Sequence, residues 1–164
     1  MKEISVYDLQ ENAFSLLKRD WMLVTAGTEQ SCNTMTISWG GLGVLWGMPV
    51  AHLYVRPTRH TYGFVEENER FTLSVLPEQY RDALKLCGAK SGRDINKFEA
   101  AGLTPVAHDG TVSVAEARLV LVCRKLYIYD IDPAQMLDRS VDRFYDNDYH
   151  RGYIAQIEKA YIAE

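Results

Sequence analysis

The sequence predicts a single, mainly β domain over residues 1–164, a closed antiparallel barrel with peripheral helices. Segments that read as strands outnumber segments with helical spacing. The helical patterns are short, and consecutive strands follow each other at hairpin-like spacing instead of alternating with long helices. These observations favour a barrel over a doubly wound sheet. A chain of 164 residues is long enough to bury one sizeable core, and it contains no repeat, linker or low-complexity segment.

Capping residues, apolar alternation and glycine positions predict the secondary structure of residues 8–46. Asp8 and Glu11 form a capping-box pattern that predicts a short helix through Leu17. A mostly apolar run over 21–26 indicates a buried strand that ends at the turn Gly27-Thr28, and residues 32–39 alternate strictly. The run from Gly40 to Gly43 does not fit the dinucleotide fingerprint, so it is interpreted as a turn before a short strand near 44–46.

The remaining elements follow from the same patterns. A strand is expected at 50–55, and Thr58 is the candidate N-cap of a helix from Arg59 to Glu67. The later elements are expected as a strand at 71–76, an amphipathic helix at 78–87, a loop at 91–94, a short helix at 97–101 stopped by Gly102, and long strands at 117–131 and 149–159.

Two polar motifs carry most of the functional information. Asn33-Thr34-Met35-Thr36-Ile37-Ser38-Trp39 places its hydroxyl side chains on one face of a strand. Arg56-Pro57-Thr58-Arg59-His60-Thr61 combines two guanidinium groups and two hydroxyls just before a helix start, which is the donor set that an anion requires. Each motif alone also fits a solvated strand or loop. Together they predict a site for a phosphorylated, aromatic small molecule.

Composition narrows the classes of partner and compartment. The formal net charge of −4 argues against nucleic acid as a partner. No apolar run reaches the length of a membrane span, and the N-terminal residues do not read as a signal peptide. Cys32, Cys87 and Cys123 are widely spaced and are expected to be reduced thiols, with Cys32 nearest the polar motif. The sequence therefore predicts a cytoplasmic protein.

Taken in order, these segments resemble the flavin reductase-like family with the FMN-binding split-barrel fold, and within it the flavoredoxin-like branch. The resemblance rests on 21–26, the two polar motifs, 71–76, the segment 87–94 with Lys97-Phe98, and His150, and it covers about residues 14–160. It implies an antiparallel Greek-key barrel and a homodimer with one FMN per subunit. The glycine-rich segment 40–47 and the segment 139–149 depart from the pattern of the short reductases.

The resemblance also implies roles for individual residues. Asn33, Thr34, Met35, Thr36, Ser38 and Trp39 would lie along the flavin ring and its ribityl chain; Arg56, Pro57, Thr58, Arg59 and Thr61 would surround the phosphate; Ser91, Arg93 and Lys97 would approach from the following loop; and His150 would hydrogen-bond the ring or order the electron donor. No histidine pair has metal-ligand spacing, so no metal is expected. No Ser/His/Asp or Cys/His signature supports hydrolysis.

Three functions remain open from the sequence. The first is an NAD(P)H-dependent flavin oxidoreductase, in which the flavin carries the redox chemistry and the protein supplies position and electrostatics. The second is a flavoredoxin-like carrier that passes electrons to a partner protein and has little NAD(P)H activity of its own. The third is a non-redox barrel that binds another phosphorylated ligand or none.

Overall fold

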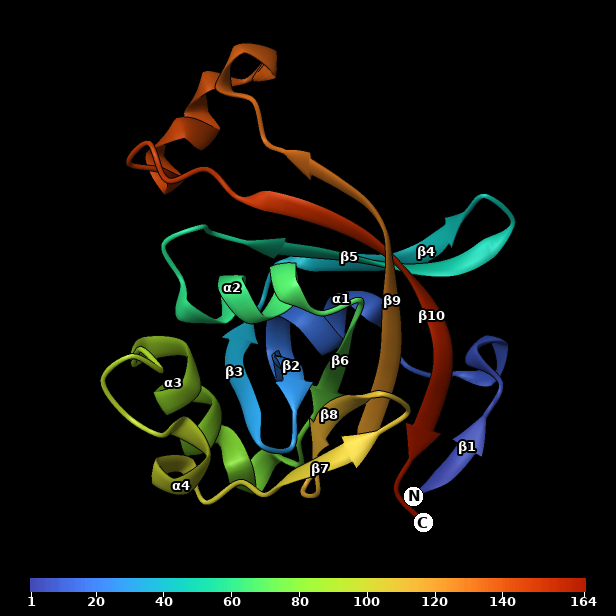
Figure 1. The fold of residues 1–164 in the computed structure, drawn as a ribbon. Coiled ribbons are helices and arrows are strands. Elements are labelled where there is room, and N and C mark those ends of the chain that lie inside the picture. The colour runs from blue at the N-terminus through green and yellow to red at the C-terminus, as the bar shows by residue number, and fades with distance from the viewer.

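The computed structural model describes residues 1–164 as one antiparallel sheet that curls into a barrel, with a small hairpin and short helices around it (Figure 1). The sheet order is β3-β2-β6-β9-β10-β5-β4, and β1 pairs with β10. Its strands are β1 (Lys2–Ile4), β2 (Met22–Thr28), β3 (Ser31–Ile37), β4 (Gly40–Leu45), β5 (Met48–Val55), β6 (Arg70–Val75), β9 (Leu119–Asp130) and β10 (Arg151–Ile162). The predicted mainly β architecture is confirmed.

The barrel is split, which confirms the split-barrel fold that the resemblance implies and corrects the expectation from the strand pattern that it is closed. β3 pairs only with β2, and β4 pairs only with β5, so the two end strands of the sheet do not pair with each other. Residues 38–39 join them across this gap. An unpaired strand edge presents backbone N–H and C=O groups that are free to bind another group. The open edge of β3 is therefore part of the setting of any site near the second half of this strand.

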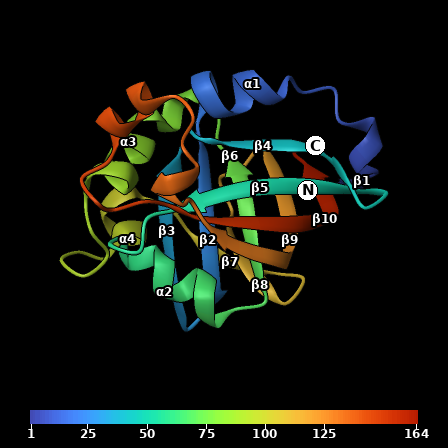
Figure 2. The same cartoon turned by 90° about the horizontal axis from the view of Figure 1, so that it is seen from above.

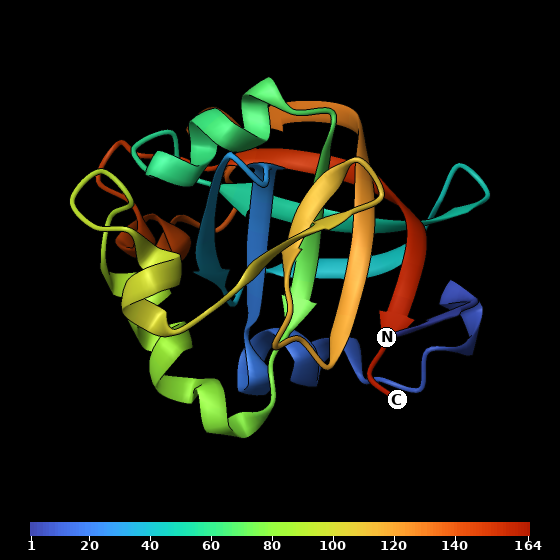
Figure 3. The same cartoon turned by 60° about the horizontal axis from the view of Figure 1, so that its bottom comes forward.

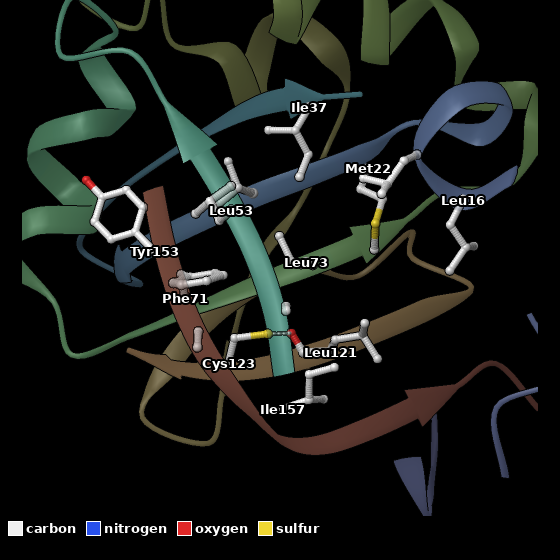
Figure 4. Packing of buried hydrophobic residues seen from close by; sticks show 14 of the residues in the cluster. Leu16, Met22, Ile37, Leu53, Phe71, Leu73, Leu121, Cys123, Tyr153 and Ile157 are labelled. Atoms are coloured by element: carbon white, nitrogen blue, oxygen red, sulfur yellow. Dashed lines mark hydrogen bonds between the residues drawn. The ribbon is translucent and has the colours of Figure 1, made fainter. Parts of the chain in front are cut away.

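Two hydrophobic cores explain why the central strands are apolar on both faces. Inside the barrel, Met22, Phe71, Leu121 and Tyr153 belong to a cluster of 20 buried residues (Figure 4). On the outer face, Leu23, Val120 and Val122 join residues of the helices in a second cluster of 11. Alternate residues of one strand thus enter different cores. This is why residues 22–26 and 119–123 read as nearly continuous apolar runs.

Two of the helices, α3 and α4, cover the outer face beside β2 and β3. The helical elements are α1 (Ala13–Ser15), α2 (His60–Glu67), α3 (Arg81–Ala89) and α4 (Lys97–Ala101). A 3-10 turn at Glu78–Tyr80 leads into α3, so the predicted helix at 78–87 is confirmed. The predicted limits of α4 are also confirmed, because Asn96 caps its first N–H groups and Gly102 adopts the left-handed conformation that ends it.

Several local expectations are corrected. Asn12, and not Asp8, caps the first helix, which continues as a π-helix at Leu16–Asp20. The segment Gly40–Gly43 is strand β4, and the turn follows at Trp46-Gly47, where both residues have positive φ as a tight hairpin requires. Arg59 occupies the N-cap position of α2 that was expected at Thr58.

Strands β1, β7 (Pro105–His108) and β8 (Thr111–Val114) were not predicted. The β7–β8 hairpin lies over β2 and β6 (Figure 3). The carbonyl of Val112 in β8 accepts a hydrogen bond of 2.7 Å from the buried hydroxyl of Thr72. This contact explains why β6 carries polar residues on the face that is turned away from the barrel core.

Residues 131–149 form a long excursion between β9 and β10, called here the strap. It contains 3-10 helices at Pro133–Gln135 and Arg139–Phe144 and extends from one end of the long β9–β10 pair (Figures 1 and 2). The backbone N–H of Ile131 donates to the carbonyl of His150, which closes the base of the strap. Both ends of the strap therefore lie beside His150, the residue that the sequence analysis placed in the site.

Candidate functional site

The hydroxyl face of β3 points toward α3 and α4. The Thr34 hydroxyl donates to the carbonyl of Val24 at 3.0 Å and lies 2.9 Å from the hydroxyl of Thr25. Thr36 donates to the carbonyl of Leu84 in α3 at 2.6 Å. Thr34 is fully buried and lines neither of the two cavities described below, so its expected place along a ligand stays a prediction. Thr36 thus meets the backbone of α3, and only the C-terminal end of the strand reaches an open cavity.

Two adjoining cavities lie where β3 ends beside β5 and α2. The first, the aromatic cavity, has a volume of about 160 Å³. Its lining residues are Met35, Thr36, Ile37, Ser38, Trp39, Tyr54, Arg56, Arg59 and His150. Met35, Arg56 and Arg59 also line the second cavity, so the two form one continuous site. An elongated ligand with one flat end and one charged end matches this shape.

The second, the cationic cavity, has a volume of about 250 Å³ and is strongly polar. Its lining residues are Met35, Arg56, Thr58, Arg59, His60, Thr61, Lys90, Ser91, Arg93, Lys97 and Asp148. Five cationic side chains thus face a single carboxylate. The N-terminus of α2 opens here, and its first N–H groups have no partner within the helix. Cations, hydroxyls and a helix N-terminus form a donor set suited to a phosphate.

The loop after α3 is fixed against α2 and β3. Asn33 donates from Nδ2 to the hydroxyl of Thr61 at 2.9 Å. Gly92 passes so close that an added Cβ would lie 2.4 Å from Oδ1 of Asn33 and 2.8 Å from the ring of His60. Arg93 donates to the carbonyl of Thr58 at 3.1 Å. These contacts bring three separated segments of chain together around one anion-binding corner.

Lys97 has a structural place in this corner. Its side chain is 4% exposed, and Nζ donates to the carbonyls of Thr34 at 2.9 Å and Cys87 at 2.8 Å. Burial lowers the pKa of this ammonium group below its ordinary value. Two of its three donors therefore tie β3 to α3. Lys97 therefore lines the cationic cavity and supports its wall through these two hydrogen bonds, and its expected approach to a ligand stays a prediction.

The strap is held on the site through Arg56. The guanidinium group forms an ion pair with Asp148, donates to the carbonyl of Phe144 at 2.7 Å and lies 5.3 Å from the ring centre of Tyr145. The ring of Phe144 also packs edge-on against Trp39 at 5.5 Å between ring centres. One arginine of the predicted anion motif is therefore already paired with a carboxylate of the chain.

His150 lies between the aromatic cavity and the strap. It is 8% exposed, lines the aromatic cavity, and its Nδ1 lies 3.1 Å from the hydroxyl of Tyr145. Burial, with a further contribution from Arg56 and Arg59, lowers the pKa of His150 to about 4. The imidazole is therefore neutral at pH 7 and can offer one donor and one acceptor.

The remaining predicted residues lie at the edge of the site or outside it. Asn33 lines a larger cavity of about 800 Å³ that is also lined by Cys32 and that shares His60, Arg93 and Lys97 with the cationic cavity. Asn33 also holds Thr61 through its hydrogen bond. Pro57 is exposed and lines neither cavity of the site. Ser91, Arg93 and Thr58 do line the cationic cavity, and Ser38 and Trp39 line the aromatic cavity.

Sequence reasoning missed Tyr54, Lys90, Tyr145 and Asp148. The signal for Lys90 was present, because it precedes Ser91 in a loop already assigned to the site. Tyr54 is the residue of β5 two positions before Arg56, on the face that reaches the cavity. No local pattern identifies the strap residues, since the Arg56–Asp148 contact joins positions 92 residues apart.

The residues present fit a phosphorylated aromatic ligand. The cationic cavity supplies a donor set for one phosphate, and the aromatic cavity supplies an open strand edge and ring-lined walls for a flat group. No group of three or more His, Cys, Asp or Glu side chains is placed to hold a metal ion. No helix combines the length and apolar character needed to cross a membrane.

Comparison with known proteins identifies the family. The sequence matches the flavin reductase like domain over residues 14–161, whereas no curated protein matches it. An FMN-binding flavin reductase-like protein from Shewanella baltica superposes with a TM-score of 0.71 at 19% identity, covering 98% of this chain and 76% of its own. Flavoredoxin from Desulfovibrio vulgaris gives 0.69 at 21% identity, covering 100% and 78%.

A third similar structure is the NADH:FAD oxidoreductase of Streptomyces globisporus, with a TM-score of 0.64, 17% identity and coverage of 88% and 74%. At these identities the structural likeness shows the fold alone. The family match covers most of the chain, and it supports a flavin as the cofactor. The resemblance found in the sequence is confirmed, and the chain belongs to the flavin reductase-like family.

Proposed function

We propose that the protein binds FMN in the joined cavities and acts as an NAD(P)H-dependent flavin oxidoreductase. The observation that carries this proposal is the continuity of a ring-lined cavity and a cationic cavity through Met35, Arg56 and Arg59. A riboflavin phosphate has one flat aromatic end and one dianionic end, so it matches both parts. When bound, the flavin supplies hydride and electron transfer itself.

The side chains of this chain bind and orient the ligand. Arg59, Lys90 and Arg93 would hold the phosphate together with the hydroxyls of Thr58 and Ser91. Lys97 and Asn33 fix the walls of that corner without reaching the ligand. The free edge of β3 offers backbone hydrogen bonds to the polar rim of the ring. His150 contributes a neutral hydrogen-bonding group at the other wall.

A spectroscopic titration tests this function directly. Purified protein is titrated with FMN while flavin fluorescence is followed, and NADH or NADPH is then added without oxygen while flavin absorbance is measured. We expect saturable binding of one FMN per chain and loss of the oxidised flavin absorbance with one of the two nucleotides. Failure to bind FMN would exclude the proposal and would favour a barrel for another ligand.

The strap favours a second candidate, an electron-transfer flavoprotein that receives electrons from a partner protein. Phe144 and Tyr145 contact Trp39 and His150, two residues of the aromatic cavity, and so restrict the approach of a nicotinamide. Rapid binding of FMN combined with negligible reduction by NADH and NADPH would select this candidate. Reduction within seconds by one nucleotide would select the oxidoreductase.

We also propose that the protein forms a homodimer near this site. Trp39 and Phe144 are 42% and 44% exposed beside the cavity, and Val44 and Trp46 are 68% and 57% exposed on the projecting β4–β5 hairpin (Figure 1). Large hydrophobic side chains that are exposed together are typical of a protein–protein interface. Analytical ultracentrifugation of the wild type and of a Trp46→Ser variant tests the assembly, and a monomeric wild type would exclude it.

A further inference from the structure

We propose that Tyr145 of the strap is a positioning residue for His150. Its phenol donates a hydrogen bond to Nδ1, so that the imidazole keeps its proton on Nε2 and presents that N–H to the aromatic cavity as a donor to the bound ring. The hydrogen bond from Nε2–H to a ring rests on the flavin-binding function proposed above. The tautomer itself is a property of the protein and can be measured without flavin.

The contacts of the strap point to this role. Every side-chain hydrogen bond, ion pair and ring contact from the strap to the rest of the protein goes to Trp39, Arg56 or His150. All three of these residues line the aromatic cavity. A segment that served only to connect β9 and β10 would not concentrate its contacts there. The strap therefore acts on the site.

The direction of the Tyr145–His150 hydrogen bond follows from the charges around it. Burial raises the pKa of Tyr145, so the phenol keeps its proton. The guanidinium group of Arg56 lies 5.3 Å from the centre of the same ring and draws electron density from it. A phenol beside a cation is a good donor and a poor acceptor, so Nδ1 of the neutral imidazole accepts. The partner of one ring nitrogen decides which nitrogen carries the proton.

The other nitrogen of His150 remains available to a ligand. Nε2 forms no hydrogen bond with the protein, and it is not among the three buried side-chain atoms without a partner, which are Ser74 Oγ, His108 Nε2 and Asp142 Oδ1. Since His150 lines the aromatic cavity and Nε2 is unpaired but not buried, we infer that Nε2 is open to this cavity. A fixed N–H in that wall would donate to a carbonyl or nitrogen acceptor of a flat ring.

The chain offers a matched control on the same segment. Tyr149 stacks on Tyr145 with ring centres 4.6 Å apart, and its hydroxyl forms no hydrogen bond with the protein. Tyr149→Phe and Tyr145→Phe therefore remove the same atom from neighbouring stacked rings. Only the second substitution removes a partner of His150.

The test is nitrogen-15 NMR of the four histidines in the full chain at pH 7.5, recorded before and after addition of FMN, with His150→Gln used to assign the His150 signals. We expect a protonated Nε2 and an unprotonated Nδ1 at His150 in the wild type and in Tyr149→Phe. Tyr145→Phe should change the tautomer ratio roughly fivefold, the effect of one lost hydrogen bond. A proton on Nδ1 in the wild type, or an unchanged ratio in Tyr145→Phe, would overturn the proposal.

FMN titrations of the same variants test the donor role. We expect the dissociation constant of Tyr145→Phe to rise several-fold and that of Tyr149→Phe to stay at the wild-type value. His150→Gln, whose amide N–H can replace Nε2–H, should bind more tightly than His150→Leu. Equal binding of FMN by the His150→Gln and His150→Leu variants would exclude a hydrogen bond from Nε2–H of His150 to the ring. If the wild type binds no FMN, the proposed function fails, and the tautomer measurement still decides the role of Tyr145.

Discussion

Arg56 in the loop before α2 forms an ion pair with Asp148 of the strap, 92 residues later in the chain. Asp148 is the only carboxylate among the residues that line the cationic cavity. An incoming phosphate and this carboxylate therefore compete for the same guanidinium group. The pair connects anion binding with the position of the strap.

Replacing the carboxylate should strengthen anion binding. Asp148→Asn removes the carboxylate that repels the phosphate and pairs with Arg56. We expect FMN to bind roughly 3- to 10-fold more tightly, which corresponds to about 1 kcal/mol. The measurement is a fluorescence titration at low and moderate salt. Asp146→Asn is the control, because Asp146 lies in the same segment outside the cavity. Weaker binding by Asp148→Asn would mean that the ion pair orders the site for the ligand.

The low pKa of His150 predicts a dependence of stability on pH. The folded protein holds this pKa at about 4, whereas an unfolded histidine titrates near 6.5. The unfolded chain therefore binds the proton first, and the stability present above pH 6.5 is lost as the pH falls toward 4, by up to about 3 kcal/mol. Urea denaturation at intervals between pH 7.5 and 4.5 measures this loss.

His150→Gln provides the comparison for that profile. The variant lacks the titrating ring, so the difference in unfolding free energy between the wild type and the variant should shrink as the pH falls. His108, whose pKa is also lowered by burial, is present in both proteins and cancels in the difference. A difference that does not change with pH would show that folding leaves the pKa of His150 unchanged.

Removing the charge of two lysines of the cationic cavity should affect different properties, stability in one case and FMN affinity in the other. Lys97→Met leaves the carbonyls of Thr34 and Cys87 without donors in a buried place, and we expect a loss of about 2–3 kcal/mol in the free energy of unfolding. Lys90→Met removes an exposed cation that has no protein partner, so stability should not change while FMN affinity falls several-fold. Chemical denaturation and FMN titration on both variants test this separation.

Glycine at position 92 is required by close packing. An added methyl group would meet the side chains of Asn33 and His60, so Gly92→Ala should lower stability by about 1–2 kcal/mol and weaken anion binding. Gly63→Ala is the control, since a Cβ at that position of α2 meets nothing and alanine favours the helix by about 0.5–1 kcal/mol. Thermal unfolding of the two variants should therefore shift in opposite directions.

The sequence predicted the fold well where local patterns decide the structure. Apolar runs or apolar alternation located β5, β6 and β9, and Gly102 gave the end of α4. Local patterns failed where the partner of a strand is distant. The glycines of β4 suggested a turn, but pairing with β5 holds them in an extended conformation. The split between β3 and β4 also depends on long-range pairing, which no local motif encodes.

The structure brings the predicted cationic residues together at one cavity and adds wall residues that the sequence did not indicate. All residues of 56–61 and 91–93 except Pro57 and Gly92 line one cavity, because α2 and the end of α3 converge there. The hydroxyl pattern of β3 was assigned to a ligand, although Thr34 and Thr36 satisfy backbone and side-chain groups inside the protein. Residues of the strap could not be predicted, since they reach the site by folding back over the end of the barrel.

Of the three thiols, only that of Cys32 is accessible from outside the folded protein. Cys87 and Cys123 are buried, and burial raises the pKa of Cys87 to about 11, whereas Cys32 is partly exposed in the larger cavity beside the anion-binding loop. A maleimide dye should therefore react with a single position in the folded chain. A fluorophore attached there would lie next to the loop that carries Arg93, and its emission would report ligand binding without any genetic change to the protein.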